Sequence, residues 1–374
     1  MADDAVFMAR ALELAARGQG ATTPNPRVGA VLVKDGSILA EGWHKVFGGP
    51  HAEVECLRQA EERGINPAGA TMYVTLEPCN HFGKTPPCSR TLLDAGLSRV
   101  VIGCLDPNPE AGGGAALLTQ GGVDVTVGVL EQECRDAIAD FVVWKTKDRP
   151  FVTVKLAMTL DGHIATQTGD SSWVSGEIAR ARVHAMRAQV QAVMIGGGTL
   201  WTDNPQLTHR LVDSPLAHNP QPLAVLVTRR PPAADAALTI LRDRPGQCVI
   251  LTGEAWAESN TADALAERGV RVWGLPEIGD GSLDLLPGLT RLRQEAGVYT
   301  LLCEGGGGLA GSLLAQDLMD ELVVFYAPKL LGDAESISGF SGLTARRMTD
   351  AVKLRFLSVE PMGEDLMVVA RPAV

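Results

Sequence analysis

The 374-residue sequence has no excess of basic residues, few aromatic side chains and no long apolar segment. A formal net charge of −11 disfavours a general binder of nucleic acids or membrane surfaces, because such binding needs a positively charged face. Aromatic residues make up only 5% of the chain, which disfavours stacking on unpaired bases. No run approaches the roughly 18 apolar residues of a membrane-spanning helix. We therefore expect neither nucleic acid nor a membrane as a partner.

Cysteine is too sparse for a disulfide-stabilised scaffold. The seven cysteines, an odd number spread along the chain, are Cys56, Cys79, Cys88, Cys104, Cys134, Cys248 and Cys303. We therefore expect reduced thiols and a cytoplasmic location.

The first 16 residues combine apolar periodicity with charges at Asp3, Asp4, Arg10 and Glu13, which predicts an amphipathic helix rather than a signal peptide.

Composition and length predict a globular protein with two α/β domains. Hydrophobic residues make up 45% and charged residues 21%, and 374 residues exceed what one core usually serves. In both halves strand-like apolar runs alternate with helix-like stretches, which is typical of layered α/β domains. The alternation breaks at the charged, proline-terminated stretch 145–150. We therefore expect one domain at 1–148 and a second at 149–374.

The predicted elements follow from apolar periodicity and from glycine and proline positions. In the first half, strands are predicted at 28–33, 38–43, 72–76, 100–104 and 123–127, and helices at 1–16, 53–63, 89–95 and 131–144. In the second half, strands are predicted at 151–156, 192–195, 223–227, 248–251 and 300–303, and helices at 177–189, 260–267 and 309–315. No fixed period links the glycine clusters, so we expect no internal repeat.

The first half contains a set of residues typical of a catalytic zinc site. His51 and Glu53 form an H-x-E segment, and Cys79 and Cys88 follow downstream. One imidazole and two thiolates suit tetrahedral zinc and leave a fourth position for water. Zinc deaminases combine such ligands with a glutamate that shuttles protons, and Glu53 has that place beside His51. Eight residues separate the two cysteines, so the intervening loop must fold back to bring both sulfurs to one ion.

Two less specific interpretations of these residues remain open. Cys79 and Cys88 are also compatible with ordinary buried thiols, and His51 with a hydrogen-bonded surface histidine. The second interpretation is a purely structural zinc site in which His81 is the fourth ligand. The position of Glu53 next to His51 favours the catalytic interpretation over both.

The second half contains a glycine-rich loop suited to phosphate. A strand-like run ending at Cys303 is followed by Glu304, the glycines 305–308 and an apolar helix, which exposes backbone N–H groups at a helix N-terminus. The loop lacks the spaced G-x-G-x-x-G of a Rossmann fold. Taken alone, it is equally compatible with a plain tight turn.

Several short motifs are shared with one known enzyme family. In the first half they are Thr23-Pro24-Asn25-Pro26-x-Val28-Gly29, Gly49 to Glu53, Thr75 to Cys79, Thr85 to Cys88 and Asp106 to Pro109. In the second half they are Lys155 to Gly162, Ser171 to Trp173, Gly196 to Thr199 and Asp203 to Arg210. With these motifs the sequence resembles the bifunctional deaminase–reductases of riboflavin biosynthesis, and the eight-residue spacing between Cys79 and Cys88 is specific to that family.

The resemblance implies a cytidine-deaminase-like three-layer domain followed by a dihydrofolate-reductase-like domain. It implies zinc-dependent removal of an exocyclic amine from a diaminopyrimidinone ribotide by the first domain, with Glu53 as the catalytic residue and His51, Cys79 and Cys88 as metal ligands. It also implies that Asn25, His44, Lys84 and Asp106 bind that substrate.

For the second domain, the resemblance implies NADPH-dependent reduction of the ribosyl side chain to a ribityl chain. The implied cofactor-binding residues are Ala157, Trp173, Thr199, Asp203, Thr228, Gly306, Gly307, Gly308, Leu309, Ala310, Gly311 and Ser312. The implied substrate-binding residues are Ser171, Arg187, Leu207, Arg210 and Glu304. Guanidinium groups suit a sugar phosphate because they bind it with two parallel hydrogen bonds.

Two other functions fit parts of the sequence. A deaminase of nucleic-acid bases would need a basic groove with stacking aromatics, and the acidic charge and low aromatic content speak against it. The second alternative is a non-catalytic zinc module joined to a nucleotide-sensing domain. Zinc-dependent release of amine from a free pyrimidine would exclude this alternative. The predicted partner is a small pyrimidine ribotide, and we expect a homo-oligomer, with a dimer favoured because dimers are the commonest assemblies of soluble enzymes.

Overall fold

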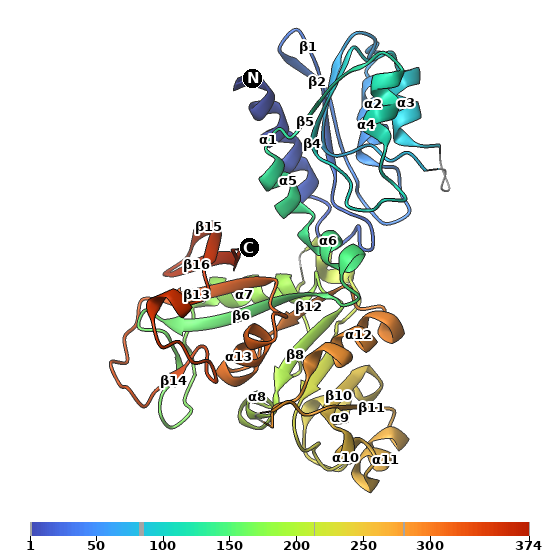
Figure 1. Cartoon of the computed structure of the whole chain (residues 1–374). Coiled ribbons are helices and arrows are strands. Elements are labelled where there is room, and N and C mark those ends of the chain that lie inside the picture. The colour runs from blue at the N-terminus through green and yellow to red at the C-terminus, as the bar shows by residue number, and fades with distance from the viewer. Residues whose placement is uncertain (1, 82–85, 213, 280, 374) are drawn as a thin grey trace. The chain divides into compact units, whose positions relative to one another are not determined.

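The computed structural model of the protein describes residues 2–81, 86–212, 214–279 and 281–373. The chain forms two compact units, residues 1–148 (unit 1) and residues 149–374 (unit 2) (Figure 1). Within the described ranges, none of the helices combines the length and the apolar character needed to cross a bilayer.

Unit 1 is built on a five-stranded mixed sheet with strand order β2-β1-β3-β4-β5. The hairpin strands β1 and β2 are antiparallel, β1 pairs antiparallel with β3, and β3, β4 and β5 are parallel to one another. The strands are β1 (Gly29–Lys34), β2 (Ser37–Trp43), β3 (Thr71–Leu76), β4 (Arg99–Cys104) and β5 (Asp124–Val127). Parallel strands end at the same edge of a sheet, so β3 and β4 deliver the residues after Leu76 and Cys104 side by side.

Helices cover both faces of the unit 1 sheet and complete a three-layer structure (Figure 1). They are α1 (Ala2–Ala16) and α5 (Glu131–Ala137) on one face, α2 (Ala52–Glu62), α3 (Cys88–Asp94) and α4 (Gly114–Gln120) on the other, and α6 (Ala139–Thr146). Two glycines permit close packing of these layers. A Cβ atom at Gly29 would lie 2.0 Å from the Ala11 carbonyl oxygen of α1, and one at Gly42 would lie 2.4 Å from the Ala52 carbonyl oxygen of α2.

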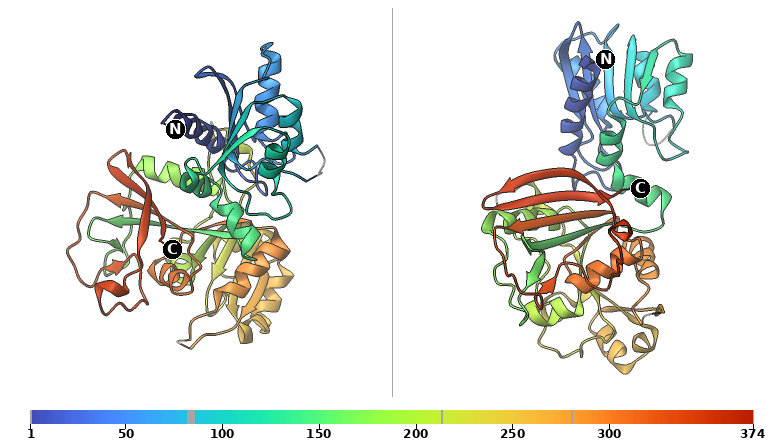
Figure 2. Two further views of the ribbon diagram at one scale, coloured as in Figure 1. Left: turned by 45° about the horizontal axis from the view of Figure 1, so that its top comes forward. Right: turned by 60° about the vertical axis from the view of Figure 1, so that its left-hand side comes forward.

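Unit 2 contains a nine-stranded sheet with strand order β11-β10-β9-β8-β12-β6-β13-β16-β15. Its first seven strands in this order are parallel, and the two C-terminal strands extend the sheet antiparallel beside β13 (red in Figure 2). The strands are β6 (Phe151–Thr159), β8 (Ala192–Gly196), β9 (Leu223–Val227), β10 (Cys248–Gly253), β11 (Arg271–Leu275), β12 (Thr300–Cys303), β13 (Glu321–Ala327), β15 (Leu354–Met362) and β16 (Asp365–Pro372). A short pair joins β7 (His163–Ala165) to β14 (Ile337–Ser338).

Two apolar clusters on opposite sides of this sheet form the core of unit 2. Buried side chains of α12 (Leu285–Ala296) and α13 (Gly307–Ala315) pack with Val152, Val154 and Leu156 of β6. The second cluster joins Val193 and Ile195 of β8 to α8 (Gly197–Asp203), α9 (Thr239–Asp243) and α11 (Asn260–Glu267). The remaining helices are α7 (Glu177–Arg187), α10 (Glu254–Ala257) and the short 3-10 helices at 215–218, 245–247 and 348–350.

One predicted helix differs from the structure. The sequence predicts a single helix over 131–144, whereas the chain forms α5 and α6 with a break at Ile138, whose φ and ψ are −116° and 20°. Ile138 is 1% exposed, so its side chain is anchored in the core at the point where the helix axis changes. The break therefore follows from packing and has no proline or glycine to mark it.

Candidate functional sites

Three side chains in unit 1 converge as a potential metal centre. His51 is the N-cap residue of α2, Cys79 lies three residues beyond the end of β3, and Cys88 is the first residue of α3. The Nδ1 atom of His51 lies 3.6 Å from the Cys79 Sγ and 3.3 Å from the Cys88 Sγ. Their three ligand atoms all lie within 4.8 Å of one another.

This arrangement fits a zinc ion. Tetrahedral zinc with bonds of about 2.0–2.3 Å places its donor atoms roughly 3.5 Å apart, which is close to the two N–S distances observed here. The Cys79 sulfur accepts hydrogen bonds from the Cys88 thiol and from His51, and these bonds lower the pKa of the Cys79 thiol below its usual range. A thiolate is the form of cysteine that binds metal. His81 is exposed and lies outside the cluster among the described residues, so the interpretation as a four-ligand structural site with His81 is not supported.

Glu53 lies in the first turn of α2, two residues after His51, and its side chain is buried. Burial raises the pKa of Glu53 to about 7. Within the described part of the chain, the Oε2 atom of Glu53 has no hydrogen-bond partner. A buried carboxylate oxygen without a partner is costly unless a ligand or water completes it, so Glu53 is placed to receive and return a proton at this site.

His44 and Asn25 form a hydrogen-bonded pair beside His51. The Nδ1 atom of His44 faces the Pro50 carbonyl oxygen at 2.9 Å, so this nitrogen carries the proton. The Nε2 atom then accepts from the Asn25 amide nitrogen at 3.2 Å. Burial lowers the pKa of His44, consistent with a neutral ring. The rings of His44 and His51 meet edge to face at 5.5 Å between centroids.

Asp106 and Lys84 are the other two residues predicted to bind the substrate of unit 1. Asp106 lies two residues beyond the end of β4 and is half-buried, and burial raises the pKa of its carboxyl group. Its Oδ1 atom accepts a hydrogen bond from the Asn108 backbone N–H at 2.8 Å. Lys84 lies outside the described residues.

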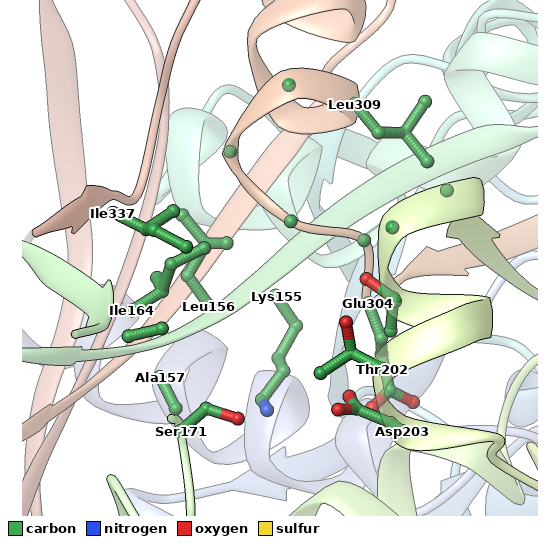
Figure 3. Close-up of a pocket in the computed structure, with 18 of the residues that line it drawn as sticks. Lys155, Leu156, Ala157, Ile164, Ser171, Thr202, Asp203, Glu304, Leu309 and Ile337 are labelled. Atoms are coloured by element: carbon green, nitrogen blue, oxygen red, sulfur yellow. The ribbon is translucent and has the colours of Figure 1, made fainter. Parts of the chain in front are cut away.

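Unit 2 contains a cavity of about 1160 Å³ at the carboxyl ends of its parallel strands (Figure 3). Ligands of open α/β sheets bind at this edge. Both glycine clusters line the cavity: the glycines 196–198 lie at the junction of β8 and α8, and the glycines 305–308 follow β12. Cβ atoms placed at Gly198 and Gly308 would meet no atom closer than 3.9 Å, so the backbone there is open to a ligand. Glycine backbone beside a helix N-terminus fits the phosphates of a dinucleotide.

Most of the residues predicted for unit 2 line this cavity. They are Ala157, Ser171, Trp173, Arg187, Thr199, Asp203, Arg210, Thr228, Glu304, Gly306, Gly307, Gly308, Leu309 and Ser312. Leu207, Ala310 and Gly311 do not line it. Leu207 and Ala310 are at most 1% exposed and belong to the two apolar clusters, and Gly311 packs against the Ser341 backbone.

Two carboxylates and five basic side chains line the cavity, although the whole chain has a net charge of −11. The basic residues are Lys155, Arg180, Arg187, Arg210 and Arg229. Glu304 forms two hydrogen bonds with Arg187, of 2.6 and 2.9 Å. Burial acts to raise the pKa of Glu304, but Arg187 and Lys155 outweigh it and hold that pKa below its usual value. A positively charged cavity in an acidic protein indicates an anionic ligand.

Lys155 and Arg180 are cavity residues that the sequence analysis did not assign. Lys155 projects from β6, with Ser171 on one side and Thr202 and Asp203 on the other in the view of Figure 3. Burial lowers its pKa. A lysine within the otherwise apolar run of β6 is a signal that could have identified it. Arg180 stacks on the exposed ring of Trp173 at 4.6 Å, a contact that sequence spacing does not reveal.

Family models match both units. Residues 1–104 match the cytidine and deoxycytidylate deaminase zinc-binding region, and residues 150–368 match the RibD C-terminal domain. The predicted fold class is therefore confirmed, with a cytidine-deaminase-like three-layer unit followed by a dihydrofolate-reductase-like unit.

Relatives match over nearly the full length. The riboflavin biosynthesis protein RibD of Aquifex aeolicus is 38% identical over 98% of this chain and 97% of its own, and that of Escherichia coli K12 is 39% identical over 97% and 98%. A crystal structure of a diaminohydroxyphosphoribosylaminopyrimidine deaminase/5-amino-6-(5-phosphoribosylamino)uracil reductase from Thermotoga maritima is 37% identical, with a TM-score of 0.80 over 99% of both chains. Acinetobacter baumannii RibD is 33% identical, with a TM-score of 0.79 over 100% of this chain and 99% of its own.

Proposed function

The chain belongs to the bifunctional deaminase–reductase family of riboflavin biosynthesis, and we propose that its two units act in succession on one pyrimidine ribotide. Unit 1 removes an exocyclic amine by hydrolysis from 2,5-diamino-6-(5-phosphoribosylamino)pyrimidin-4(3H)-one. Unit 2 then reduces the ribosyl side chain to give 5-amino-6-(5-phosphoribitylamino)uracil. The cofactors are zinc for the first step and NADPH for the second.

The observation that carries the deaminase proposal is the buried Glu53 carboxyl group beside the His51, Cys79 and Cys88 cluster, whose Oε2 atom has no hydrogen-bond partner among the described residues. Zinc held by these three side chains supplies the Lewis acidity that makes water a nucleophile at neutral pH. The Oε2 atom of Glu53 takes a proton from the attacking water and delivers one to the departing amine, which leaves as ammonia while the ring carbon gains a carbonyl oxygen. Asn25 and the neutral His44 bind the pyrimidine: the His44 ring orients the Asn25 amide, whose oxygen and second N–H serve as acceptor and donor.

In unit 2, NADPH supplies the hydride. The glycine backbones at 196–198 and 305–308 bind its phosphates, and Arg210 binds the substrate phosphate. Glu304, kept ionised by Arg187 and Lys155, accepts a hydrogen bond from a hydroxyl group of the ribosyl chain. Ser171 lines the same cavity and binds the substrate together with Glu304.

An ultraviolet assay of the purified full chain on the diaminopyrimidinone ribotide, run with and without NADPH alongside zinc analysis, tests both assignments. We expect deamination without NADPH, and oxidation of NADPH only when the deaminated product is present. Bound zinc with neither reaction would contradict the proposal. The same batch is then assayed with cytidine and single-stranded DNA to test a nucleic-acid base deaminase.

We further propose that the protein is a cytoplasmic homodimer whose partners are small molecules. All seven cysteines are free thiols, which suits a reducing compartment. The charge of −11 disfavours nucleic acid. Light scattering coupled to size-exclusion chromatography should give twice the chain mass of 39.5 kDa.

A further inference from the structure

Glu77 is a buried carboxylate that the reaction outlined above does not use. It follows β3 directly and precedes the predicted zinc ligand Cys79 by two residues. Its side chain is buried, and its backbone N–H donates to the Cys104 carbonyl oxygen at the end of β4 at 2.9 Å. Glu77 thus lies where the two central parallel strands of unit 1 end side by side.

The carboxylate of Glu77 accepts three backbone hydrogen bonds. Its Oε2 atom accepts from the Asp106 N–H at 3.2 Å, and its Oε1 atom accepts from the Gly113 and Ala115 N–H groups, each at 3.0 Å. Asp106 begins the segment 106–113 that runs from β4 to α4, and Gly113 ends it. One side chain therefore fixes both ends of this segment.

The middle of segment 106–113 is attached to the residues around the cysteines. The Asn80 N–H donates to the Ala111 carbonyl oxygen at 2.9 Å, and Ser89, next to Cys88, donates through its hydroxyl to the Asn80 side chain at 3.1 Å. A Cβ atom at Gly114 would lie 1.9 Å from the Pro78 carbonyl oxygen, so the start of α4 packs directly on the chain leading to Cys79. Segment 106–113 and the residues that flank Cys79 and Cys88 consequently form one hydrogen-bonded assembly.

We propose that Glu77 is a positioning residue of the deaminase site, which holds Asp106 in place for the substrate by fixing the ends of segment 106–113. The inference rests on the proposed deaminase function. A carboxylate suits this position because two acceptor oxygens can satisfy three converging N–H donors, whereas a glutamine would turn a donor toward one of them. Glu77 acts through the segment and does not contact the reacting atoms.

The test compares Glu77→Gln and Glu77→Ala with Glu110→Gln, which changes an exposed carboxylate within the same segment. For both Glu77 variants we expect the KM for the diaminopyrimidinone ribotide to rise about tenfold or more, since a hydrogen bond to a charged group is lost. Zinc content should stay at the wild-type value, and reduction of the deaminated product by unit 2 should be unchanged. Glu110→Gln should match the wild type in all three measurements.

A double-mutant cycle with Asp106→Ala separates positioning from general stabilisation. If Glu77 acts through Asp106, adding Glu77→Gln to Asp106→Ala should raise the KM by less than twofold further. Full additivity of the two effects on the KM would overturn the proposal. So would a wild-type KM in Glu77→Ala, or a fall in the deaminase activity of Glu77→Gln that matches its loss of bound zinc. Absence of deamination by the wild-type protein would instead refute the proposed function.

Discussion

Arg187 and Glu304 form a doubly hydrogen-bonded ion pair in the cavity wall of unit 2, with Nε–Oε1 and Nη2–Oε2 distances of 2.6 and 2.9 Å. Their side chains are only 13% and 10% exposed. The remaining terminal nitrogen of Arg187, Nη1, donates to the Thr208 carbonyl oxygen at 3.0 Å. The guanidinium group therefore bonds within the protein while it lines the cavity, and the substrate contact that the family resemblance implies for Arg187 stays a prediction.

Replacing Arg187 by methionine should destabilise unit 2 by about 3 kcal/mol, because the variant leaves the Glu304 carboxylate buried without its partner. Denaturant unfolding followed by tryptophan fluorescence measures the loss, and Arg187→Met/Glu304→Met should recover much of it. Arg210→Met is the control, since Arg210 is exposed and has no side-chain partner in the described part of the chain. Equal stability of Arg187→Met and the wild type would show that the pair is dispensable for folding.

Arg210 also lines the cavity, and its guanidinium group has no ion pair or hydrogen bond with the residues that the structure describes, so we expect it to bind the substrate phosphate. We expect Arg210→Met to raise the KM for the deaminated ribotide by about tenfold or more, because two charge-assisted hydrogen bonds are lost. The turnover number should change little, since the phosphate lies away from the reacting carbon. Steady-state NADPH oxidation gives both values, and an unchanged KM would remove Arg210 from the phosphate site.

Glu53→Gln should abolish deamination while leaving the zinc content and the reductase activity at wild-type values. The amide has nearly the same shape but cannot take up a proton, so the expected fall in deaminase turnover is about 100-fold or more. Glu55→Gln is a suitable control in the same helix turn, because Glu55 bonds instead to Lys45 and Arg58. A Glu53→Gln variant with normal turnover would exclude Glu53 as the proton carrier.

The sequence predicts the parts of this protein that depend on local patterns. Cys303, the glycines 305–308 and the apolar helix after them follow one another in the structure as expected, with α13 beginning at Gly307. The proximity of His51, Cys79 and Cys88 follows from the zinc-site pattern, and the structure brings their donor atoms together. The chemistry of each cluster could thus be inferred before its geometry was known.

Features that depend on distant contacts could not be predicted in this way. The Arg187–Glu304 pair joins residues 117 positions apart, and no spacing rule connects them. Residues 309–315 are predicted as one helix, but only packing decides that Leu309 faces the cavity while Ala310 is fully buried. The strands β15 and β16 also escape the prediction, because exposed and buried residues do not alternate regularly along them.

Two neighbouring glycines of α13 should respond differently to alanine. A Cβ atom at Gly308 would have the Ser341 hydroxyl as its nearest neighbour, at 3.9 Å, whereas one at Gly307 would lie 2.3 Å from the Ser338 carbonyl oxygen. Gly308→Ala should therefore fold normally but raise the KM for NADPH about tenfold, because the methyl group occupies space beside the cofactor phosphates. Gly307→Ala should lower the thermal stability of unit 2. An unchanged KM in Gly308→Ala would mean that the phosphates do not approach this glycine.

Asp4 should stabilise unit 1 in a pH-dependent manner. Its buried carboxylate accepts hydrogen bonds from Arg99 at 2.9 and 3.1 Å and from the Tyr73 hydroxyl at 2.8 Å, and Arg99 is the main cause of its lowered pKa. A carboxyl group whose folded pKa lies below its unfolded value of about 3.9 contributes its full stability above that value and loses it as the pH falls through the folded pKa.

Asp4→Asn should therefore lower the free energy of unfolding by about 2 kcal/mol from pH 8 down to about pH 5, and the deficit should shrink as the pH falls further. Asp124→Asn is the matched control, because Asp124 also faces Arg99, at 3.5 Å, but is 72% exposed and should contribute little. Urea unfolding of both variants across this pH range measures the difference. A deficit in Asp4→Asn that stayed constant as the pH fell from 5 to about 2 would assign the effect to packing, because the contribution of the charged carboxylate is lost only as the pH falls through its lowered folded pKa.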